Sequence, residues 1–325
     1  MNKKKKYICI LGAGKMGLEY SNILRSKNYK IYAASSSSKR SKSWILFKKK
    51  NPNTIYLNND EILRNSECNY IISCLPHLLQ VDYFPKLLKS NKRILIEKPF
   101  SLNSNLYKKI IKKNSKNIKN KFLGFNRREY ETVKLLKNRI KKNDIKYVDV
   151  KINENTKKKS SYNNKKFKKY FPYYGSSSHI IDLLFYLFRD LKVKNKWHNW
   201  SGKASYPSVY SVLETKNKIP IFLFIEKDAS LKIGIDIVFE DNTLWSLSPI
   251  EKLTVYKGYN ISKISKKNRY LKYAQKIIYE KFENPKQKPG FQNQIVNFVE
   301  NRMKKTNFHQ YYNYLKFYEK IFLFK

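Results

Sequence analysis

A glycine-rich segment near the start of the chain, Gly12–Gly17, has the spacing of a phosphate-binding turn. It follows the apolar run Tyr7–Leu11 and leads into Met16–Ser26, which has helical spacing. A strand, a glycine turn and a helix in this order are typical of a dinucleotide site. The residues expected to contact the dinucleotide here are Gly12, Gly14, Lys15, Met16 and Gly17.

Each glycine of this segment has its own physical role. Gly12 permits the tight turn, Gly14 lets a pyrophosphate approach the backbone, and Gly17 allows the helix to pack closely on the sheet. The first turn of the helix offers free N–H groups and a positive dipole to the phosphates. A tight turn without any ligand is the alternative interpretation.

The end of the second predicted strand, Lys30–Ala34, indicates which dinucleotide is bound. The acidic residue that usually holds the adenosine ribose is missing there, and Ser35–Ser38 is followed by Lys39 and Arg40. Hydroxyls and cations suit a 2′-phosphate, so NADP is favoured over NAD. The expected contacts are Ser35, Ser36, Lys39 and Arg40. Alternatively, the two cations simply belong to a lysine-rich surface.

Three further segments carry groups that could do chemistry. Ser73–His77 and Glu97–Pro99 each follow a predicted strand, and His179–Asp182 lies at the start of a predicted helix. Together with the glycine turn, and in this order, they resemble the glucose–fructose oxidoreductase, inositol dehydrogenase and rhizopine-catabolism family (Gfo/Idh/MocA). The resemblance spans nearly the whole chain.

The resemblance implies a catalytic role for Lys98, His179 and Asp182. A lysine ammonium can stabilise an alkoxide, and desolvation can lower its pKa toward proton exchange. His179 would act as the acid–base partner of the substrate hydroxyl, and Asp182 would orient its ring or reach the substrate. Glu97 would contact the nicotinamide ribose or hold Lys98. The other expected lining residues of the cofactor cleft are Cys74, Leu75, Pro76 and His77.

Residues expected to bind the substrate are Asn126, Arg127 and Tyr174. Arg127 and its neighbour Arg128 could bind a carboxylate or a phosphate, or they could be a surface pair. One departure from the family pattern concerns Gly175, where many sugar-oxidising members have an aspartate four residues before the histidine. Its absence implies that Lys98 and His179 suffice, that the substrate differs, or that turnover is weak.

The order of the strands and helices that must position these residues predicts an α/β protein of two domains. Residues 1–121 alternate strands and helices, which predicts a Rossmann-type parallel sheet covered on both faces. Strands are expected at Tyr7–Leu11, Lys30–Ala34, Tyr70–Leu75 and Arg93–Glu97, and helices at Met16–Ser26 and Val81–Lys89.

Residues 122–325 read as an α+β domain with a mainly antiparallel open sheet. The expected strands are Lys121–Phe125, which leads into this domain, Lys146–Ile152, Ser208–Thr215, Ile219–Lys227, Leu231–Phe239 and Leu244–Ser248. The expected helices are Tyr130–Lys142, Ser178–Arg189, Gln292–Lys304 and Phe308–Phe322. The polar stretch 153–169 is expected to be a loop.

Composition narrows the class of protein. The net charge is +45, but only 10 of the 69 basic residues are arginine and the lysines are scattered. Because nucleic-acid readers favour arginine, the charge indicates a solvated surface, and neither nucleic acid nor membrane is expected as a partner. The three cysteines, Cys9, Cys68 and Cys74, are expected to be reduced thiols in a cytoplasmic protein. No metal site is expected.

These observations favour an NAD(P)-dependent oxidoreductase, a dehydrogenase acting on the CH–OH group of a sugar or sugar derivative. The run Gly175–His179 is similar to that of family members associated with bacterial surface-sugar biosynthesis, which implies a role in that process. A catalytically weak, dinucleotide-binding regulatory protein of the same fold is the alternative. A nucleic-acid-binding protein that uses its charge is a third hypothesis, and it predicts steeply salt-dependent binding. Members of the family commonly associate through the open face of the second-domain sheet, and Ile219–Lys227 and Leu231–Phe239 would place apolar side chains on such a face. The resemblance therefore implies a homodimer or homotetramer.

Overall fold

The computed structural model describes residues 7–142, 144–155, 170–200, 206–262, 264, 269–285, 288–304 and 307–322. The chain forms two compact units. The first comprises Met1–Glu129 and Lys286–Lys316, and the second comprises Tyr130–Pro285 and Phe317–Lys325. The first unit thus includes a late segment that lies within the range 122–325, which the sequence assigned as a whole to the second domain.

The first unit is built on a six-stranded parallel sheet, with the strand order β3-β2-β1-β4-β5-β6. Its strands are β1 (Ile8–Leu11), β2 (Ile31–Ala34), β3 (Ile55–Tyr56), β4 (Tyr70–Ser73), β5 (Arg93–Glu97) and β6 (Lys121–Gly124). Consecutive residues of β1 are buried, as are those of β5 after Arg93, so both faces of the sheet are covered. The predicted Rossmann-type parallel sheet is confirmed.

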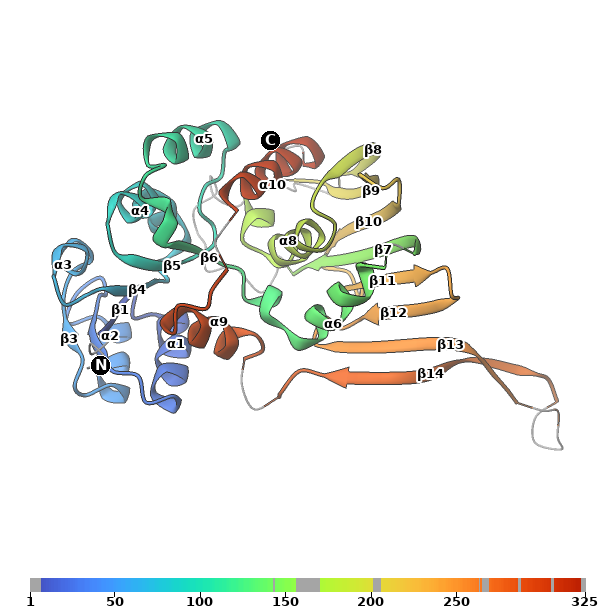
Figure 1. The fold of residues 1–325 in the computed structure, drawn as a ribbon, viewed down its shortest axis with the longest axis horizontal. Coiled ribbons are helices and arrows are strands. Elements are labelled where there is room, and N and C mark those ends of the chain that lie inside the picture. Colours follow the sequence, from blue (N-terminus) through green and yellow to red (C-terminus); the bar gives the residue numbers. More distant parts are fainter. Residues whose placement is uncertain are drawn as a thin grey trace. The chain divides into compact units, whose positions relative to one another are not determined.

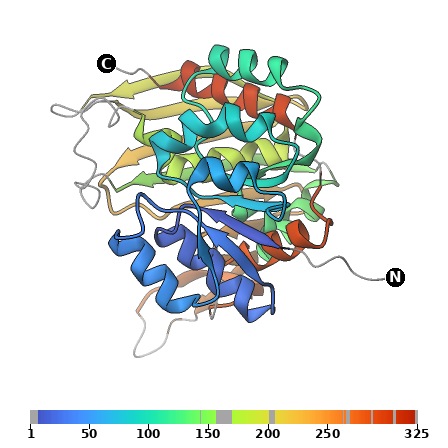
Figure 2. The ribbon, with the colours of Figure 1, turned by 90° about the vertical axis from the view of Figure 1, so that its left-hand side faces the viewer.

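Helices surround this sheet, as Figure 2 shows in blue to teal. They are α1 (Lys15–Ser26), α2 (Lys42–Lys50), α3 (Asn59–Arg64), α4 (His77–Lys89) and α5 (Ser104–Lys113). The late helix α9 (Phe291–Val299) packs on α1, where the rings of Tyr20 and Phe291 lie 5.2 Å apart. Two short 3-10 helices are η1 (Ile118–Asn120) and η2 (Asn126–Glu129).

The second unit is built on an eight-stranded sheet, with the strand order β14-β13-β12-β11-β7-β10-β9-β8. Neighbouring strands are antiparallel except β7 and β10, which are parallel. The strands are β7 (Ile145–Glu154), β8 (Leu191–Asn199), β9 (Ser208–Thr215), β10 (Pro220–Lys227), β11 (Gly234–Phe239), β12 (Thr243–Leu247), β13 (Lys252–Ser262) and β14 (Lys272–Phe282). The predicted, mainly antiparallel sheet is confirmed.

Helices α6 (Glu131–Ile140) and α8 (Ser176–Phe188) cover one face of this sheet (Figure 1). A short 3-10 helix, η4 (Phe171–Tyr173), precedes α8, and α10 (Phe308–Ile321) contributes residues to both units. Strand β10 shows the difference between the two faces. Its Ile221, Leu223 and Ile225 are fully buried, whereas Phe222 and Phe224 are 38% and 36% exposed. The second face of the sheet is therefore open.

Three expectations need correction. Cys9 of β1 and Cys68 form a disulfide, so the prediction of three reduced thiols was wrong for this pair. The physical reason is that β1 lies next to β4, which Cys68 shortly precedes. The Cα atoms of the two cysteines are therefore 5.7 Å apart, although 59 positions separate them in the sequence. Strand β7 continues through Glu154, where a loop was expected from Asn153; residues 156–169 of that predicted loop lie outside the described residues. Finally, strands β3, β8, β13 and β14 were not predicted.

Candidate cofactor and substrate site

The glycine turn has the geometry of a phosphate cradle. Gly12 has φ +99°, and a Cβ there would lie 2.7 Å from the carbonyl oxygen of Cys74. A Cβ on Gly17 would collide with the carbonyl oxygen of Gly12. By contrast, a Cβ on Gly14 would meet nothing within 4 Å, and no side chain caps α1 at this residue. The helix N-terminus therefore faces open space where an anionic group fits.

Ser35 supports this turn from behind. Its hydroxyl accepts a hydrogen bond from the Gly12 N–H at 3.0 Å and donates one to Asn59 Oδ1 at 2.5 Å. Its carbonyl accepts the N–H of Ala13 at 2.7 Å. The sequence predicted Ser35 as a cofactor contact. In the structure its hydrogen bonds shape the glycine turn. Asn59 was not predicted, since nothing in the sequence links it to a turn 47 residues earlier.

Three hydroxyls gather where β2 ends and α2 begins. Ser36 Oγ lies 2.8 Å from both Ser41 Oγ and Ser43 Oγ. Ser41 caps α2 by accepting the N–H of Trp44 at 3.2 Å, and the first turn of α2 contains no acidic residue. Lys39 and Arg40 lie exposed in the connecting loop. Hydroxyls, cations and a helix N-terminus are therefore combined at the edge where the ribose of a dinucleotide is expected.

The turn after β4 lies beside the glycine turn. The N–H of Cys74 donates to the carbonyl of Leu11 at 2.8 Å, and its thiol lies 3.2 Å from the carbonyl oxygen of Gly12. Burial raises the pKa of this thiol well above its ordinary value, which makes Cys74 a packing residue and not a nucleophile. Leu75 is buried, Pro76 precedes α4, and His77 is its half-buried first residue.

Glu97 ends β5 as a buried carboxylate. It accepts a hydrogen bond from the phenol of Tyr20, which also lies 3.3 Å from Gln294 Oε1. Burial raises the pKa of Glu97, while the Tyr20 hydrogen bond and the charge of Lys98 lower it. Lys98 is half-buried and is joined to Pro99 by a cis peptide bond. Tyr20 and Gln294 were missed by the sequence reading, because they lie on helices far from Glu97 along the chain.

A group of cations lies next to this carboxylate. Lys288 Nζ lies 3.4 Å from Met16 Sδ and 4.4 Å from the centre of the Phe291 ring. Partial burial lowers the pKa of Lys288, and the charges of Lys15 and Arg127 lower it further, whereas Glu97 opposes them. Arg127 Nη1 is buried without a hydrogen-bond partner among the described residues. These three cations, one of which is Arg127 with its unsatisfied guanidinium nitrogen, fit an anionic ligand.

Asn126 has a structural contact as well. It is buried, and its side-chain amide donates to the carbonyl of Pro289 at 3.1 Å. It therefore fixes the segment that carries Lys288. Lys288 itself was not predicted, since among so many lysines only its place in the fold distinguishes it.

The remaining predicted residues belong to the second unit. Tyr174 is buried, and α8 carries half-buried His179 and buried Asp182 three residues later. The buried carboxylate of Glu154 accepts the backbone N–H of Ser176 at 2.8 Å and that of Ser177. It holds the N-terminus of the helix that presents His179. Lys98 lies in the first unit, so the pairing of Lys98 with His179 stays a prediction.

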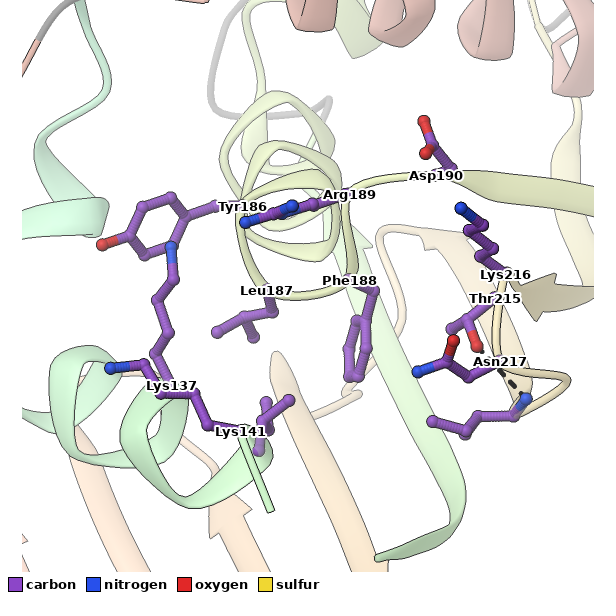
Figure 3. Close-up of a pocket in the computed structure, with 12 residues that line it drawn as sticks. Lys137, Lys141, Tyr186, Leu187, Phe188, Arg189, Asp190, Thr215, Lys216 and Asn217 are labelled. Carbon is purple, nitrogen blue, oxygen red and sulfur yellow. Dashed lines mark hydrogen bonds between the residues drawn. The ribbon is translucent and has the colours of Figure 1, made fainter. Parts of the chain in front are cut away.

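A cavity of about 570 Å³ lies elsewhere in the second unit, between α6, the end of α8 and the turn from β9 to β10 (Figure 3). Lys137 points over the ring of Tyr186, with Nζ 3.1 Å from its centre, and Phe188 points into the cavity. None of the predicted site residues lines it. Within the described residues, no group of three His, Cys, Asp or Glu could hold a metal ion, and no helix could span a membrane.

Comparison with known proteins agrees with this geometry. No curated protein matches the chain in sequence. Among solved structures, an oxidoreductase from Thermotoga maritima is similar with a TM-score of 0.74 at 16% identity, covering 99% of this chain and 98% of its own. The WlbA dehydrogenase from Bordetella pertussis, in complex with NADH and UDP-GlcNAcA, has a TM-score of 0.73 at 11% identity. The match covers 99% of this chain and 95% of the WlbA chain. KijD10, a 3-ketoreductase from Actinomadura kijaniata in complex with TDP-benzene and NADP, has a TM-score of 0.69 at 8% identity. The match covers 97% of this chain and 96% of the KijD10 chain.

These likenesses show the fold. In sequence, residues 6–125 match the model of the Gfo/Idh/MocA oxidoreductase family with an NAD-binding Rossmann fold. That range contains the glycine turn, the turn after β4 and Glu97–Pro99. Over these residues the chain is similar to the Gfo/Idh/MocA oxidoreductase family.

Proposed function

We propose that the protein is an NAD(P)-dependent dehydrogenase that moves a hydride to or from a CH–OH carbon of a sugar or sugar derivative. The observation that carries this proposal is the open cradle at Gly14, with Lys15, Arg127 and Lys288 beside it. When bound, a nicotinamide dinucleotide would accept or donate the hydride. Binding of UDP-GlcNAcA by the WlbA dehydrogenase supports a sugar-type substrate.

NADP is the favoured cofactor. The cluster of Ser36, Ser41 and Ser43 offers three hydroxyls at the N-terminus of α2, and Lys39 and Arg40 add positive charge. A ribose 2′-phosphate would gain from each of these, whereas a plain ribose would lack the usual acidic partner. The structural neighbours do not decide the question, because KijD10 holds NADP and the WlbA dehydrogenase holds NADH.

Lys98 and His179 would handle the proton of the substrate hydroxyl. The Lys98 ammonium would stabilise an alkoxide, and His179 would exchange the proton, with Asp182 orienting its ring. Glu97, held by Tyr20, would keep Lys98 in place through its charge. Arg127 and Tyr174 would bind the sugar or its acidic substituent, and Asn126 would position the neighbouring segment.

Calorimetric titration with NADPH and with NADH at moderate salt tests the cofactor site. NADPH should bind more tightly, and Ser36→Asp should weaken NADPH by about tenfold or more, because a carboxylate would repel the 2′-phosphate. Ser115→Asp, which adds the same charge at an exposed position of the same unit, is the control and should leave both affinities unchanged. If neither dinucleotide bound, the proposal would fail. Equal binding of both by the wild type would remove the NADP preference alone.

A second candidate is a dinucleotide-binding regulatory protein with weak turnover. It is favoured by Gly175, which replaces the family's carboxylate, and by Glu154, whose two oxygens are both engaged by backbone N–H groups. Absorbance at 340 nm during incubation with NADP and a panel of sugars and nucleotide sugars distinguishes the two. Substrate-dependent NADPH formation that is lost in Lys98→Met supports the enzyme; tight binding without turnover in either direction supports the regulator.

A further inference from the structure

The cavity of about 570 Å³ at the end of α8, drawn in Figure 3, lies wholly within the second unit. Its walls come from the last turns of α6 and α8 and from the turn between β9 and β10. Phe188 lies nine residues after His179, which is about 13.5 Å along a helix, so this cavity is distinct from the predicted catalytic residues. Pockets for small molecules have volumes of about 300–1,000 Å³, and this one falls within that range.

The interior of the cavity is apolar. Ile140, Leu187 and Ile219 line it and are buried. Phe188 is half-buried, and its ring points into the cavity from the end of α8 (Figure 3). An aromatic ring with aliphatic neighbours packs well against a planar apolar group, whereas it offers few hydrogen bonds to a bare sugar.

Positive charge predominates among the polar lining residues. The cations that line the cavity are Lys137, Lys141, Arg189 and Lys216, and the only acid in its lining among the described residues is Asp190. Figure 3 shows Asp190 pointing away from Phe188, so its carboxylate is turned from the interior. No ion pair of Arg189 or Lys216 occurs in the described part of the chain.

The turn that carries Lys216 is fixed by its own hydrogen bonds. The backbone N–H of Thr215 donates to the carbonyl of Ile219 at 3.0 Å, and the Thr215 hydroxyl accepts the N–H of Ile219 at 3.1 Å. The acid of this hairpin, Glu214, pairs with Lys218 at 3.5 Å. The backbone at Lys216 is therefore held in place before any ligand binds, which lowers the entropic cost of binding.

The positive charge exceeds what the two helix ends need. Both α6 and α8 end at the cavity, and each helix C-terminus acts as about half a negative charge. Together with Asp190 they supply about two negative charges, against four positive side chains. About two positive charges remain, and a phosphate monoester carries a charge of about −1.5 to −2 near pH 7.

Arg189 is held in an unfavourable backbone conformation. It ends α8 with φ +64° and ψ −80°, and the N–H of Asp190 donates to the carbonyl of Phe188 at 2.9 Å. A γ-turn with a positive φ is rare and strained in an L-residue, whereas a helix more often ends on a glycine. Strain of this kind concentrates at ligand-binding positions. An arginine at this position therefore points to a function for its guanidinium.

We propose that the cavity binds a phosphate monoester with a planar apolar part, of which a nucleoside monophosphate is the common cellular form. The Arg189 guanidinium donates two parallel hydrogen bonds to the phosphate, and the lining lysines add charge. The base packs on Phe188. The site goes beyond the proposed function, because it lies in the second unit and takes a ligand that is neither the dinucleotide nor the sugar.

Calorimetric titration with AMP, GMP, UMP and CMP tests the site. Saturating NADPH is present, so that the dinucleotide site is filled. At least one monophosphate should bind, and its nucleoside, ribose 5-phosphate and inorganic phosphate should each bind about tenfold more weakly or less tightly still, because each lacks one half of the ligand. If the protein bound no dinucleotide, the proposed function would fail, and the same titration without NADPH would still test the cavity.

Arg189→Gly separates binding from folding. It should weaken binding of the monophosphate about tenfold or more, because it removes the bidentate donor. It should not lower the midpoint of thermal unfolding, because glycine adopts a positive φ without strain. Lys218→Gly is the matched control: it removes one positive charge at φ +65° in the neighbouring turn, outside the cavity lining, and should leave the affinity unchanged.

Photolabelling locates the ligand. In the presence of NADPH, 8-azidoadenosine 5′-monophosphate should label peptides that contain Phe188 or the turn from Thr215 to Ile219. Three results would overturn the inference: no monophosphate binds, Arg189→Gly binds as tightly as the wild type, or the label is confined to peptides of the first unit.

Discussion

The phenol of Tyr20 donates a hydrogen bond to the buried carboxylate of Glu97. One residue lies on α1, which starts at the glycine turn, and the other ends β5, beside Lys98. The contact therefore ties the predicted cofactor cradle to the predicted catalytic lysine. Both groups are buried, so loss of this hydrogen bond would leave a buried carboxylate with one partner fewer.

Tyr20→Phe should lower the free energy of unfolding by about 1.5–3 kcal/mol, the typical contribution of a hydrogen bond to a charged group. In a Glu97→Gln background the same change should cost less, about 0.5–1.5 kcal/mol, because the bond is then between neutral groups. Urea unfolding of the four proteins of this cycle measures the difference. Equal losses in both backgrounds would contradict a charge-assisted bond.

The same pair predicts a pH dependence. Burial raises the pKa of Glu97 above its ordinary value. Glu97 therefore contributes stability that is complete below the ordinary carboxyl pKa and is lost as the pH rises through the folded pKa. Tyr20→Phe removes a bond that lowers this pKa, so the loss should move to higher pH. Stability measured from pH 4 to 8, relative to Glu97→Gln, should show the shift; a shift to lower pH would contradict it.

Lys288 should contribute to dinucleotide affinity through its charge. Lys288→Ala should weaken NADPH and NADH alike by about tenfold, or about 1.4 kcal/mol, because the group common to both is the pyrophosphate. Lys49→Ala, an exposed change on α2, is the control and should have little effect. Calorimetry at two salt concentrations measures both. A loss confined to NADPH would instead place Lys288 at the 2′-phosphate.

The Cys9–Cys68 disulfide should stabilise the first unit. Closing a loop of this length contributes about 4 kcal/mol by the chain-entropy model. Cys68→Ser should lower the free energy of unfolding by up to that amount, and a reductant should do the same to the wild type. Alkylation of the unfolded, unreduced protein followed by mass spectrometry should find one free thiol, Cys74. Three alkylated cysteines would show that the bond does not form.

Residues that act through local geometry were predictable from sequence. The Gly12–Gly17 turn and the parallel strands around it follow from short-range patterns, since a turn, a strand and a helix each have their own periodicity. Ser41 caps α2 through a residue only three positions away, which is a local pattern. Its contact with Ser36 depends on how the loop before α2 folds back, which the sequence does not reveal. The roles of Tyr20, Asn59 and Lys288 depend on packing between distant segments, which a single sequence does not encode as a pattern.

Strands β13 and β14 escaped prediction for a different reason. Strand β14 reads Lys-Tyr-Ala-Gln-Lys-Ile-Ile-Tyr-Glu-Lys-Phe, with apolar residues on both faces and no clean alternation. A half-buried strand alternates because one side faces water and the other a core within the same chain. Every residue of β14 is exposed at the edge of the sheet, so neither of its faces is constrained by a core.

Substitutions at Gly14 and Gly17 should separate an effect on dinucleotide binding from an effect on the stability of the fold. A Cβ on Gly17 would overlap the Gly12 carbonyl, so Gly17→Ala should lower the free energy of unfolding by about 1–3 kcal/mol, as overpacking does. A Cβ on Gly14 would enter open space, so Gly14→Ala should leave stability within about 0.5 kcal/mol. If that space holds the pyrophosphate, Gly14→Ala should still weaken NADPH binding tenfold or more, because the methyl would lie between the ligand and the helix N-terminus. Unchanged affinity in Gly14→Ala, measured beside its unfolding curve, would show that the phosphates bind elsewhere.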